Sequence, residues 1–285
     1  MTLCIAWKNG GQIKFASDSR LSVSDAEYSD IGIKVMDVPV VIKGPTSFET
    51  GITDIIYNYK LGMCFCGDSM NAYLIKETIY EALQHLQAIP EHTDISLKSI
   101  CKVIAKFFEN TSDELRNGSN WDPEVEFLIG GYCPEEKDIL VFKFELVDYK
   151  TYYKAIFDEV LIDDGEMIIM GSGTDKAEEN ISIHSIPVSN QLLKVLRDVC
   201  KDDTEPSVGG FIQYGHFKDS NFNILGVEDY TVDTDGNIEY IFAYRGTVMY
   251  KDKFERTDTD FHMAYNFIRP FQDEIDEAWK QKGIE

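Results

Sequence analysis

Two pairs of predicted helices, each set between groups of predicted strands, constrain the fold of this chain more than any other feature. Apolar residues recur at helical spacing over 74–86 and 97–108, which predicts the first pair. The second pair is predicted to begin at about residue 174 and to cover 191–200. A doubly wound sheet alternates single helices with strands, so paired helices argue against that class. We predict an α+β fold in which two stacked sheets carry helix pairs on their outer faces.

The predicted strands lie before, between and after the helix pairs. They cover 3–8, 13–17, 33–36, 38–42, 61–66, 125–131, 139–145, 152–157, 166–170, 209–217, 224–232 and 238–244. Residues 43–60 contain two glycines and a proline among polar residues, so we expect an inserted loop there. We assign 1–245 to one domain that carries this insertion. Residues 246–285 are expected to be a C-terminal extension packed on the same domain, with a helix over 263–282.

The charge of the chain argues against several classes of partner. It has 27 Lys and Arg residues against 50 Asp and Glu residues, a formal net charge of −23. Such a polyanion disfavours sequence-independent binding to nucleic acid or to anionic membranes. No stretch approaches the roughly 20 apolar residues of a membrane-spanning helix, and the first residues lack the pattern of a signal peptide. We expect a cytoplasmic protein with reduced cysteines and no nucleic-acid or membrane partner.

Motifs that would indicate several other chemistries are missing. The sequence has no G-x4-G-K-[ST] phosphate loop, no G-x-S-x-G turn and no H-E-x-x-H helix. Its five histidines have no metal-ligand spacing, and 233–236 matches only the start of a calcium loop. We therefore predict no metal and no cofactor. A protease built on Ser, His and Asp is poorly supported.

The N-terminus offers a nucleophile of another kind. Methionine aminopeptidase acts where the second residue is small, so Thr2 would become the first residue once Met1 is removed. A hydroxyl needs a base to take its proton near neutral pH. An α-amine, with a pKa of about 7.7–8.0, is partly neutral at cellular pH and can be that base. Thr2 would then carry both nucleophile and base.

Two further residues stand at informative distances from Thr2. Asp18 follows it within the segment Phe-Ala-Ser-Asp-Ser-Arg, and Lys34 follows Asp18 after the same interval again. With these offsets the chain resembles the β-type subunits of the proteasome, and among them the bacterial HslV and Anbu groups, over about residues 2–245. In that family the Asp and the Lys complete the catalytic core. The resemblance implies a four-layer αββα sandwich of the Ntn-hydrolase type and a threonine-type peptidase.

Three glycine-containing turns extend the resemblance. The turn at Gly67 resembles the one before the family's first helix, which implies that the Gly67 N–H forms the oxyanion hole. The Met-Gly-Ser-Gly turn at Ser172 and the Ser-Val-Gly-Gly turn at Ser207 resemble the family turns whose serines assist the α-amine. Three more residues are carried over by position as substrate-binding: Leu21, Ser22 and Ser69.

Two departures from the family pattern bear on the site. The family has an Asp three residues before the second serine, whereas Thr204 stands there and Asp203 one position earlier, which leaves the role of Asp203 open. The segment between Lys34 and Gly67 is also longer than is usual in the family. The extra length places the 43–60 insertion near the site.

The resemblance leaves more than one function open. An N-terminal-threonine hydrolase would cleave a peptide or amide substrate through an acyl-enzyme ester. Family members lead us to expect a homo-oligomer, a ring or an open spiral, while an unfoldase partner stays undefined. A non-catalytic ring subunit, or an Ntn amidohydrolase acting on a small molecule, would share the fold. The joint presence of Thr2, Asp18 and Lys34 favours the hydrolase, since a scaffold does not require that set.

Overall fold

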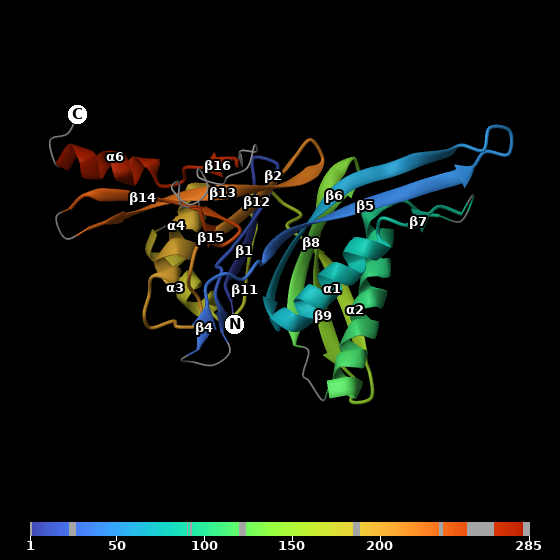
Figure 1. Ribbon diagram of the computed structural model, residues 1–285, viewed down its shortest axis with the longest axis horizontal. Helices are drawn as coiled ribbons and strands as arrows, with labels where there is room; N and C mark the ends of the chain where they lie inside the picture. Colours follow the sequence, from blue (N-terminus) through green and yellow to red (C-terminus); the bar gives the residue numbers. More distant parts are fainter. Residues whose placement is uncertain are drawn as a thin grey trace, which may run out of the picture.

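The computed structural model has a mixed α/β architecture built mostly from strands. It describes residues 2–22, 27–89, 91, 93–119, 124–184, 189–233, 236–249 and 265–281. Figure 1 shows two large sheets, the first with α3, α4 and α6 and the second with α1 and α2. The helices span Ser69–Ala82 (α1), Leu97–Ser119 (α2), Thr174–His184 (α3), Ser189–Cys200 (α4) and Gln272–Gln281 (α6).

The first sheet has the strand order β11-β1-β2-β12-β13-β14-β15, with β16 parallel to β13. Its strands are β11 (Met167–Met170), β1 (Cys4–Asn9), β2 (Gln12–Ser17), β12 (Gln213–Lys218), β13 (Asn221–Val232), β14 (Ile238–Tyr244), β15 (Thr247–Val248) and β16 (Phe267–Ile268). The N-terminal strand therefore lies inside the sheet, between β2 and β11. This position ties the start of the chain to segments from its middle and end.

The second sheet has the order β10-β9-β8-β6-β5-β7. Its strands are β10 (Tyr153–Val160), β9 (Asp138–Asp148), β8 (Val125–Cys133), β6 (Thr53–Gly67), β5 (Val35–Thr46) and β7 (Leu86–Gln87). A separate two-stranded ribbon pairs β3 (Leu21–Ser22) with β4 (Tyr28–Ser29). The predicted strands and helix pairs thus occur in the predicted order, except that 33–36 and 38–42 are not two strands but parts of the single strand β5, which begins at Val35.

Side chains alternate from Leu3 through β1 between two environments. Leu3, Ile5 and Trp7 pack with buried residues of α3 and α4. Cys4 and Ala6 join a cluster that also contains residues of the second sheet. Period-two alternation of this kind is what a strand buried on both faces requires.

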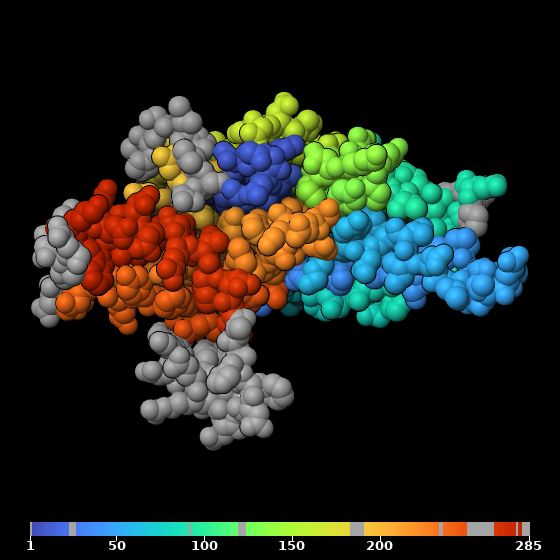
Figure 2. All heavy atoms as spheres, turned by 90° about the horizontal axis from the view of Figure 1, so that it is seen from above, coloured from blue at the N-terminus to red at the C-terminus, as the bar shows by residue number. Residues whose placement is uncertain are grey.

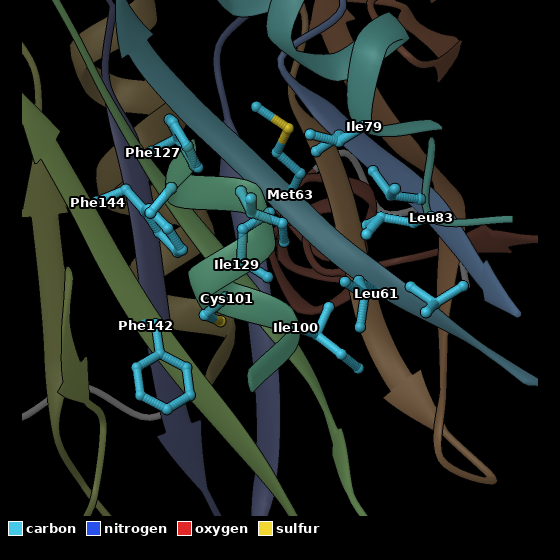
Figure 3. Close-up of a cluster of buried hydrophobic side chains, with 14 of the residues drawn as sticks. Leu61, Met63, Ile79, Leu83, Ile100, Cys101, Phe127, Ile129, Phe142 and Phe144 are labelled. Carbon is cyan, nitrogen blue, oxygen red and sulfur yellow. The ribbon is translucent and has the colours of Figure 1, made fainter. Parts of the chain in front are cut away.

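The second sheet is covered on its other face by α1 and α2. Figure 3 shows Met63 and Leu61 of β6 beside Ile79 of α1 and Leu83, the residue that caps α1, with Ile100 from α2 in the same cluster. Phenylalanines of neighbouring strands complete it, and the rings of Phe127 and Phe144 are stacked with centroids 4.7 Å apart. Apolar packing on this scale explains why the helical periodicity was readable in the sequence.

An aromatic cluster fills part of the space between the two sheets. Phe15 of β2 lies 5.4 Å from Phe222 and 6.2 Å from Phe217, measured between ring centroids. These rings belong to the same cluster as Cys64 and Leu128 of the second sheet. The first sheet consequently packs on the second through apolar side chains, while each sheet contacts its own helices on the opposite face.

The loop conformation predicted for 43–60 is wrong, because those residues form the outer half of a β-hairpin. Strands β5 and β6 pair from Val35–Cys64 out to Thr46–Thr53, with register shifts after Ile42 and after Lys43. The bulges absorb the irregular Gly-Pro step without ending the ladder. Figures 1 and 2 show the hairpin projecting at the right-hand end of the molecule, away from the N-terminus. The expectation that this segment lies near the site is therefore also wrong.

The described part of the C-terminal extension packs on the first sheet. Phe271 is buried among residues of α4 and the sheet, and Glu274 forms salt bridges with Lys194 and Arg197 of α4. Of the helix predicted over 263–282, α6 covers Gln272–Gln281, and residues 263, 264 and 282 lie outside the described residues. The prediction is wrong over 265–271, where Phe267–Ile268 form strand β16 and Pro270 precedes the helix. No helix within the described ranges is both long and apolar enough to span a membrane.

Candidate active site

Thr2 is buried at the start of the first sheet, next to the N-terminal residue. Its backbone N–H donates to Ser172 Oγ at 3.2 Å. The turn that carries Ser172 begins at Gly171, which has a positive φ of 101°. A Cβ on Gly171 would lie 2.0 Å from the carbonyl oxygen of Thr2. Only glycine allows the turn to approach the N-terminus this closely.

Asp18 and Lys34 form a salt bridge with an N–O distance of 2.8 Å, and both side chains are 0% exposed. Asp18 Oδ1, which accepts from Lys34 Nζ, also accepts the N–H of Leu3 at 3.0 Å. Its Oδ2 accepts the N–H groups of Arg20 and Gly209 at 3.0 and 3.2 Å. Four donors thus surround one buried carboxylate, which is the condition for keeping such a charge inside a protein. The salt bridge is tied directly to the backbone that follows Thr2.

Gln213, which the sequence reasoning missed, holds the backbone at Lys34, the residue directly before β5. Its Oε1 accepts the N–H of Lys34 at 2.9 Å, while its Nε2 donates to the carbonyl oxygens of Asp18 and Gly32 at 3.1 and 2.6 Å. The side chain is buried at the start of β12, which pairs with β2 next to Asp18. The sequence signal that could have identified Gln213 is a lone amide at the start of an apolar strand.

The two predicted serines meet beside Thr2. Ser172 Oγ and Ser207 Oγ are 2.6 Å apart, and Ser207 in turn donates to the carboxylate of Glu205. Asp203, whose role the sequence left open, is exposed, whereas Glu205 is partly buried. The carboxylate that the structure brings to Ser207 is therefore that of Glu205, two residues before it. Glu205 is the second residue that the sequence reasoning missed.

Arg20 fixes the loop that carries Ser207. It makes a two-pronged salt bridge with Asp30, at 2.7 and 3.1 Å, and donates to the carbonyl oxygens of Pro206 and Val208 at 3.2 and 3.3 Å. The hydrogen bond to Asp30 raises the pKa of Arg20 above its ordinary value. Because the guanidinium bonds the carbonyl groups of both neighbours of Ser207, it fixes the position of that serine.

The remaining predicted residues lie on segments around this centre. Gly67 ends β6 with a φ of 96°, and a Cβ there would lie 2.5 Å from the carbonyl oxygen of Glu124. The residue before it, Cys66, contacts the Gly171 turn. Ser69 is the first residue of α1, and Ser22 lies in β3 beside Leu21. Leu21 packs on Gly32, two residues before Lys34.

Thiols near the site are held in their protonated form. Burial raises the pKa of the Cys4 thiol well above its ordinary value, and burial does the same for Cys66. Cys4 Sγ donates to the carbonyl oxygen of Phe65 at 2.8 Å. A thiol that stays protonated is a poor nucleophile, so burial disfavours these cysteines in that role.

Metal ligands are not gathered in the part of the chain that the structure describes. No group of three or more His, Cys, Asp or Glu side chains there is arranged to hold a metal ion. The polar groups that the structure brings together at this site are hydroxyls, one buried cation and two carboxylates.

Comparison with models of protein families and with curated protein sequences gives no match. Solved structures do match. The Anbu complex from Pseudomonas aeruginosa, described as a helical assembly, is 14% identical with a TM-score of 0.53, over 78% of this chain and 85% of that one. An Anbu Gly-1 mutant from Hyphomicrobium sp. strain MC1 is 13% identical with a TM-score of 0.54, over 85% and 88%. Anbu from Yersinia bercovieri, described as an ancestral β-subunit, is 14% identical with a TM-score of 0.52, over 78% and 86%. The predicted resemblance to the Anbu group is therefore confirmed at the level of the fold.

Proposed function

We propose that this chain is an N-terminal-threonine hydrolase that cleaves peptide or amide bonds through an acyl-enzyme ester. Its scaffold would be the four-layer αββα sandwich of the Ntn hydrolases, formed by one domain over 1–245 with 246–285 packed on it. The observation that carries the proposal is the fully buried Asp18–Lys34 salt bridge, bonded to the backbone directly after Thr2. Burying an ion pair seldom stabilises a fold relative to apolar residues, so its presence favours a role in chemistry.

The reaction would begin with the removal of Met1, which frees the α-amine of Thr2. Thr2 Oγ attacks the substrate carbonyl carbon while the amine takes the hydroxyl proton and passes it to the leaving nitrogen. Water then adds to the ester carbonyl, the amine again takes the proton, and the threonine hydroxyl leaves. Lys34 stabilises negative charge that develops on Oγ, and Asp18 fixes the position of Lys34.

A chain of hydroxyls would orient the amine during both steps. Ser172 accepts from the nitrogen of Thr2, Ser207 bonds Ser172, and Glu205 accepts from Ser207. The carboxylate end of this chain favours the protonated form of the amine after the proton transfer. Glu205 would thus replace the aspartate of the family pattern.

The oxyanion and the substrate would be bound by neighbouring segments. The N–H of Gly67 is proposed to donate to the oxyanion, since the turn adjoins Cys66 beside the Gly171 turn. The substrate-binding residues proposed are those carried over by position: Leu21, Ser22 and Ser69.

The chain would act as a cytoplasmic homo-oligomer, in a ring or an open spiral. The helical assembly of the Pseudomonas aeruginosa Anbu complex supports an open arrangement. A peptide substrate fits an assembly that restricts access to the site. Any unfoldase that would deliver it remains undefined.

Mass spectrometry of the intact protein tests the mechanism. Met1 should be absent, and an epoxyketone, which reacts with both the hydroxyl and the amine of an N-terminal threonine, should add its mass at Thr2. The T2A variant should fold, take up no inhibitor and lose hydrolysis by at least about 10⁴-fold. Retention of Met1 in active protein, or hydrolysis by T2A at the wild-type rate, would overturn the proposal.

One control and two possible outcomes distinguish the hydrolase from the other functions open to this fold. A thiol reagent should leave activity unchanged, because the cysteines near the site are buried and protonated. A scaffold subunit would take up no inhibitor at all. An amidohydrolase for small molecules would be labelled and would cleave small amides but leave peptides intact.

A further inference from the structure

The outer end of the β5–β6 hairpin exposes apolar side chains that its own chain leaves uncovered. Residues 45–56 form this arm, and all of them are exposed except Thr53, which is partly buried. Phe48 at the tip is fully exposed, and Ile52 and Ile55 are 62% and 58% exposed. Figures 1 and 2 show the arm standing clear of the rest of the molecule. An apolar surface in such a position marks an interaction site.

The arm keeps its shape through contacts within itself. Thr46 and Thr53 bond through their hydroxyls at 2.8 Å, and the Ser47 N–H donates to the Ile52 carbonyl oxygen at 2.9 Å. Gly51, with a φ of 67°, closes the turn and donates to the carbonyl oxygen of Ser47. The arm therefore presents Phe48 and Ile52 on a formed hairpin, which lowers the ordering cost of binding.

A groove between α1 and α2 offers a surface of the complementary kind. Its volume is ≈ 550 Å³, within the range of pockets that hold several large apolar groups. Leu74 from α1 and Phe107 and Leu115 from α2 supply its apolar lining. The groove is lined by residues of α1 and α2 alone, whereas the arm of the same chain projects beyond these helices.

Charge favours contact of the arm with the part of α2 that lies next to this groove. The arm carries Glu49 and Asp54 and no basic residue. Along α2, three exposed lysines recur at every fourth position, and the same row continues into Asn110, Glu114 and Gly118 of the groove. These lysines are Lys98, Lys102 and Lys106. On a chain with a net charge of −23, they form a local basic stripe along the N-terminal part of α2. Lys106 pairs with Glu109 at 3.1 Å, and the charged residue in the groove lining is Glu114, so Lys98 and Lys102 carry the charge argument.

We propose that the arm of one copy docks into the α1–α2 groove of a second copy of this chain. Phe48 and Ile52 would enter the apolar groove, while Glu49 and Asp54 would face the lysine stripe of α2. The two surfaces differ, so the contact is head-to-tail, and repeated contacts produce a ring or an open helix. The inference rests on the homo-oligomer of the proposed function and adds the contact between its copies. The family resemblance does not provide that contact, because the segment between Lys34 and Gly67 is longer here than is usual in the family.

Sedimentation velocity over a range of protein concentrations tests the arm. The F48S/I52S variant should associate about 100-fold more weakly than the wild type, because two apolar side chains lose their burial in the partner. The matched control is I162S, which truncates an equally exposed isoleucine on the turn after β10. Wild-type association by F48S/I52S, or a wild type that stays monomeric throughout, would overturn the proposal.

Disulfide trapping tests the partner surface. An F48C chain mixed with an N110C chain should form a mixed disulfide dimer under mild oxidation, and the wild type, whose cysteines are buried or partly buried, should not. Cross-linking of F48C only to itself would assign the arm to a symmetric contact and refute the groove. The K98E/K102E variant should dissociate, and adding E49K/D54K to the same chain should restore association.

The catalytic proposal and this one fail in different measurements. T2A should lose hydrolysis and keep the sedimentation profile of the wild type. F48S/I52S should lose assembly and still lack Met1, since the arm lies far from the N-terminus. A change in one readout without the other therefore identifies which proposal is wrong.

Discussion

Lys34 and Phe48 lie close together in the sequence, at the two ends of one segment that leads into and along β5. The ammonium of Lys34 is 0% exposed, whereas the ring of Phe48 is fully exposed. In most proteins the lysine side chain is exposed and the phenylalanine ring is buried. A buried charge costs free energy unless it is paired, and an exposed phenylalanine forgoes about 1.5–3 kcal/mol of burial.

Lys34 and Phe48 therefore represent two different costs to stability: a buried charge and an exposed apolar ring. At the site, four donors to Asp18 offset the cost of the buried charge, so the region is densely bonded inside one chain. In the arm nothing offsets the exposure within the chain, so the compensation is expected from a second copy. Buried polar groups and exposed apolar groups are the informative cases in a fold, and here they indicate chemistry and assembly respectively.

The largest effect is expected from breaking the buried salt bridge. K34M should abolish hydrolysis and lower the free energy of unfolding by about 3–5 kcal/mol, because Asp18 is left buried without its cation. Chemical denaturation and an activity assay measure the two losses. The matched control is K60M, which removes the lysine of the exposed Lys60–Asp37 pair and should cost no more than about 1 kcal/mol. Equal destabilisation by both variants would show that the contrast in burial has no energetic meaning.

The next effect concerns the carboxylate at the end of the serine chain. E205Q keeps the acceptor oxygen for Ser207 but removes its charge, and we expect hydrolysis to fall by about 10²-fold with little change in stability. D203N is the matched control, since Asp203 is an exposed carboxylate two residues away. Loss of activity in D203N with full activity in E205Q would show that Asp203, and not Glu205, is the carboxylate that supports hydrolysis.

A smaller effect on stability is expected from the cluster of Glu274, Lys194 and Arg197, which joins α6 to α4 and is partly buried. E274Q removes the partner of Arg197 and Lys194 and should lower the free energy of unfolding by about 1–3 kcal/mol at neutral pH. These donors overcome the effect of desolvation and lower the pKa of Glu274 from 4.5 to about 2. A depressed folded-state pKa contributes stability above the unfolded value that disappears as the pH falls through the folded one.

Denaturation of wild type and E274Q from pH 7 to pH 2 measures that dependence. The difference between them should stay constant above about pH 5 and shrink between 4.5 and 2. D276N, on the exposed face of the same helix, should track the wild type throughout. A difference that grows on acidification would contradict the assigned sign.

The smallest effect on the monomer is expected at the arm. At concentrations below association, F48S should change the free energy of unfolding by less than about 0.5 kcal/mol, since the ring is already in water. F127A, in the core of Figure 3, should cost about 3–5 kcal/mol. A large loss in F48S would mean that the arm stabilises its own chain and would remove the contrast with Lys34.

Much of the secondary structure was predictable because burial imposes a period on the sequence. Strand β14 was predicted to the residue, and the helix pairs lie where apolar residues recur at helical spacing. The hairpin over 43–60 was missed for a physical reason. The side chains of its outer part are exposed on both faces, so no alternation marks the strands, and Gly44 and Pro45 resemble a turn although bulges absorb them.

The sequence by itself determined the catalytic candidates and their spacing from Thr2, because residue identity and offset can be read without coordinates. Only the tertiary structure decided which carboxylate reaches Ser207, that Gln213 holds Lys34 in place, and that Arg20 bonds both neighbours of Ser207. Those contacts join residues up to 188 positions apart and depend on how β1, β2 and β12 lie side by side. Local sequence carries periodicity and turn chemistry, whereas a site assembled from distant segments exists only once the sheets have packed.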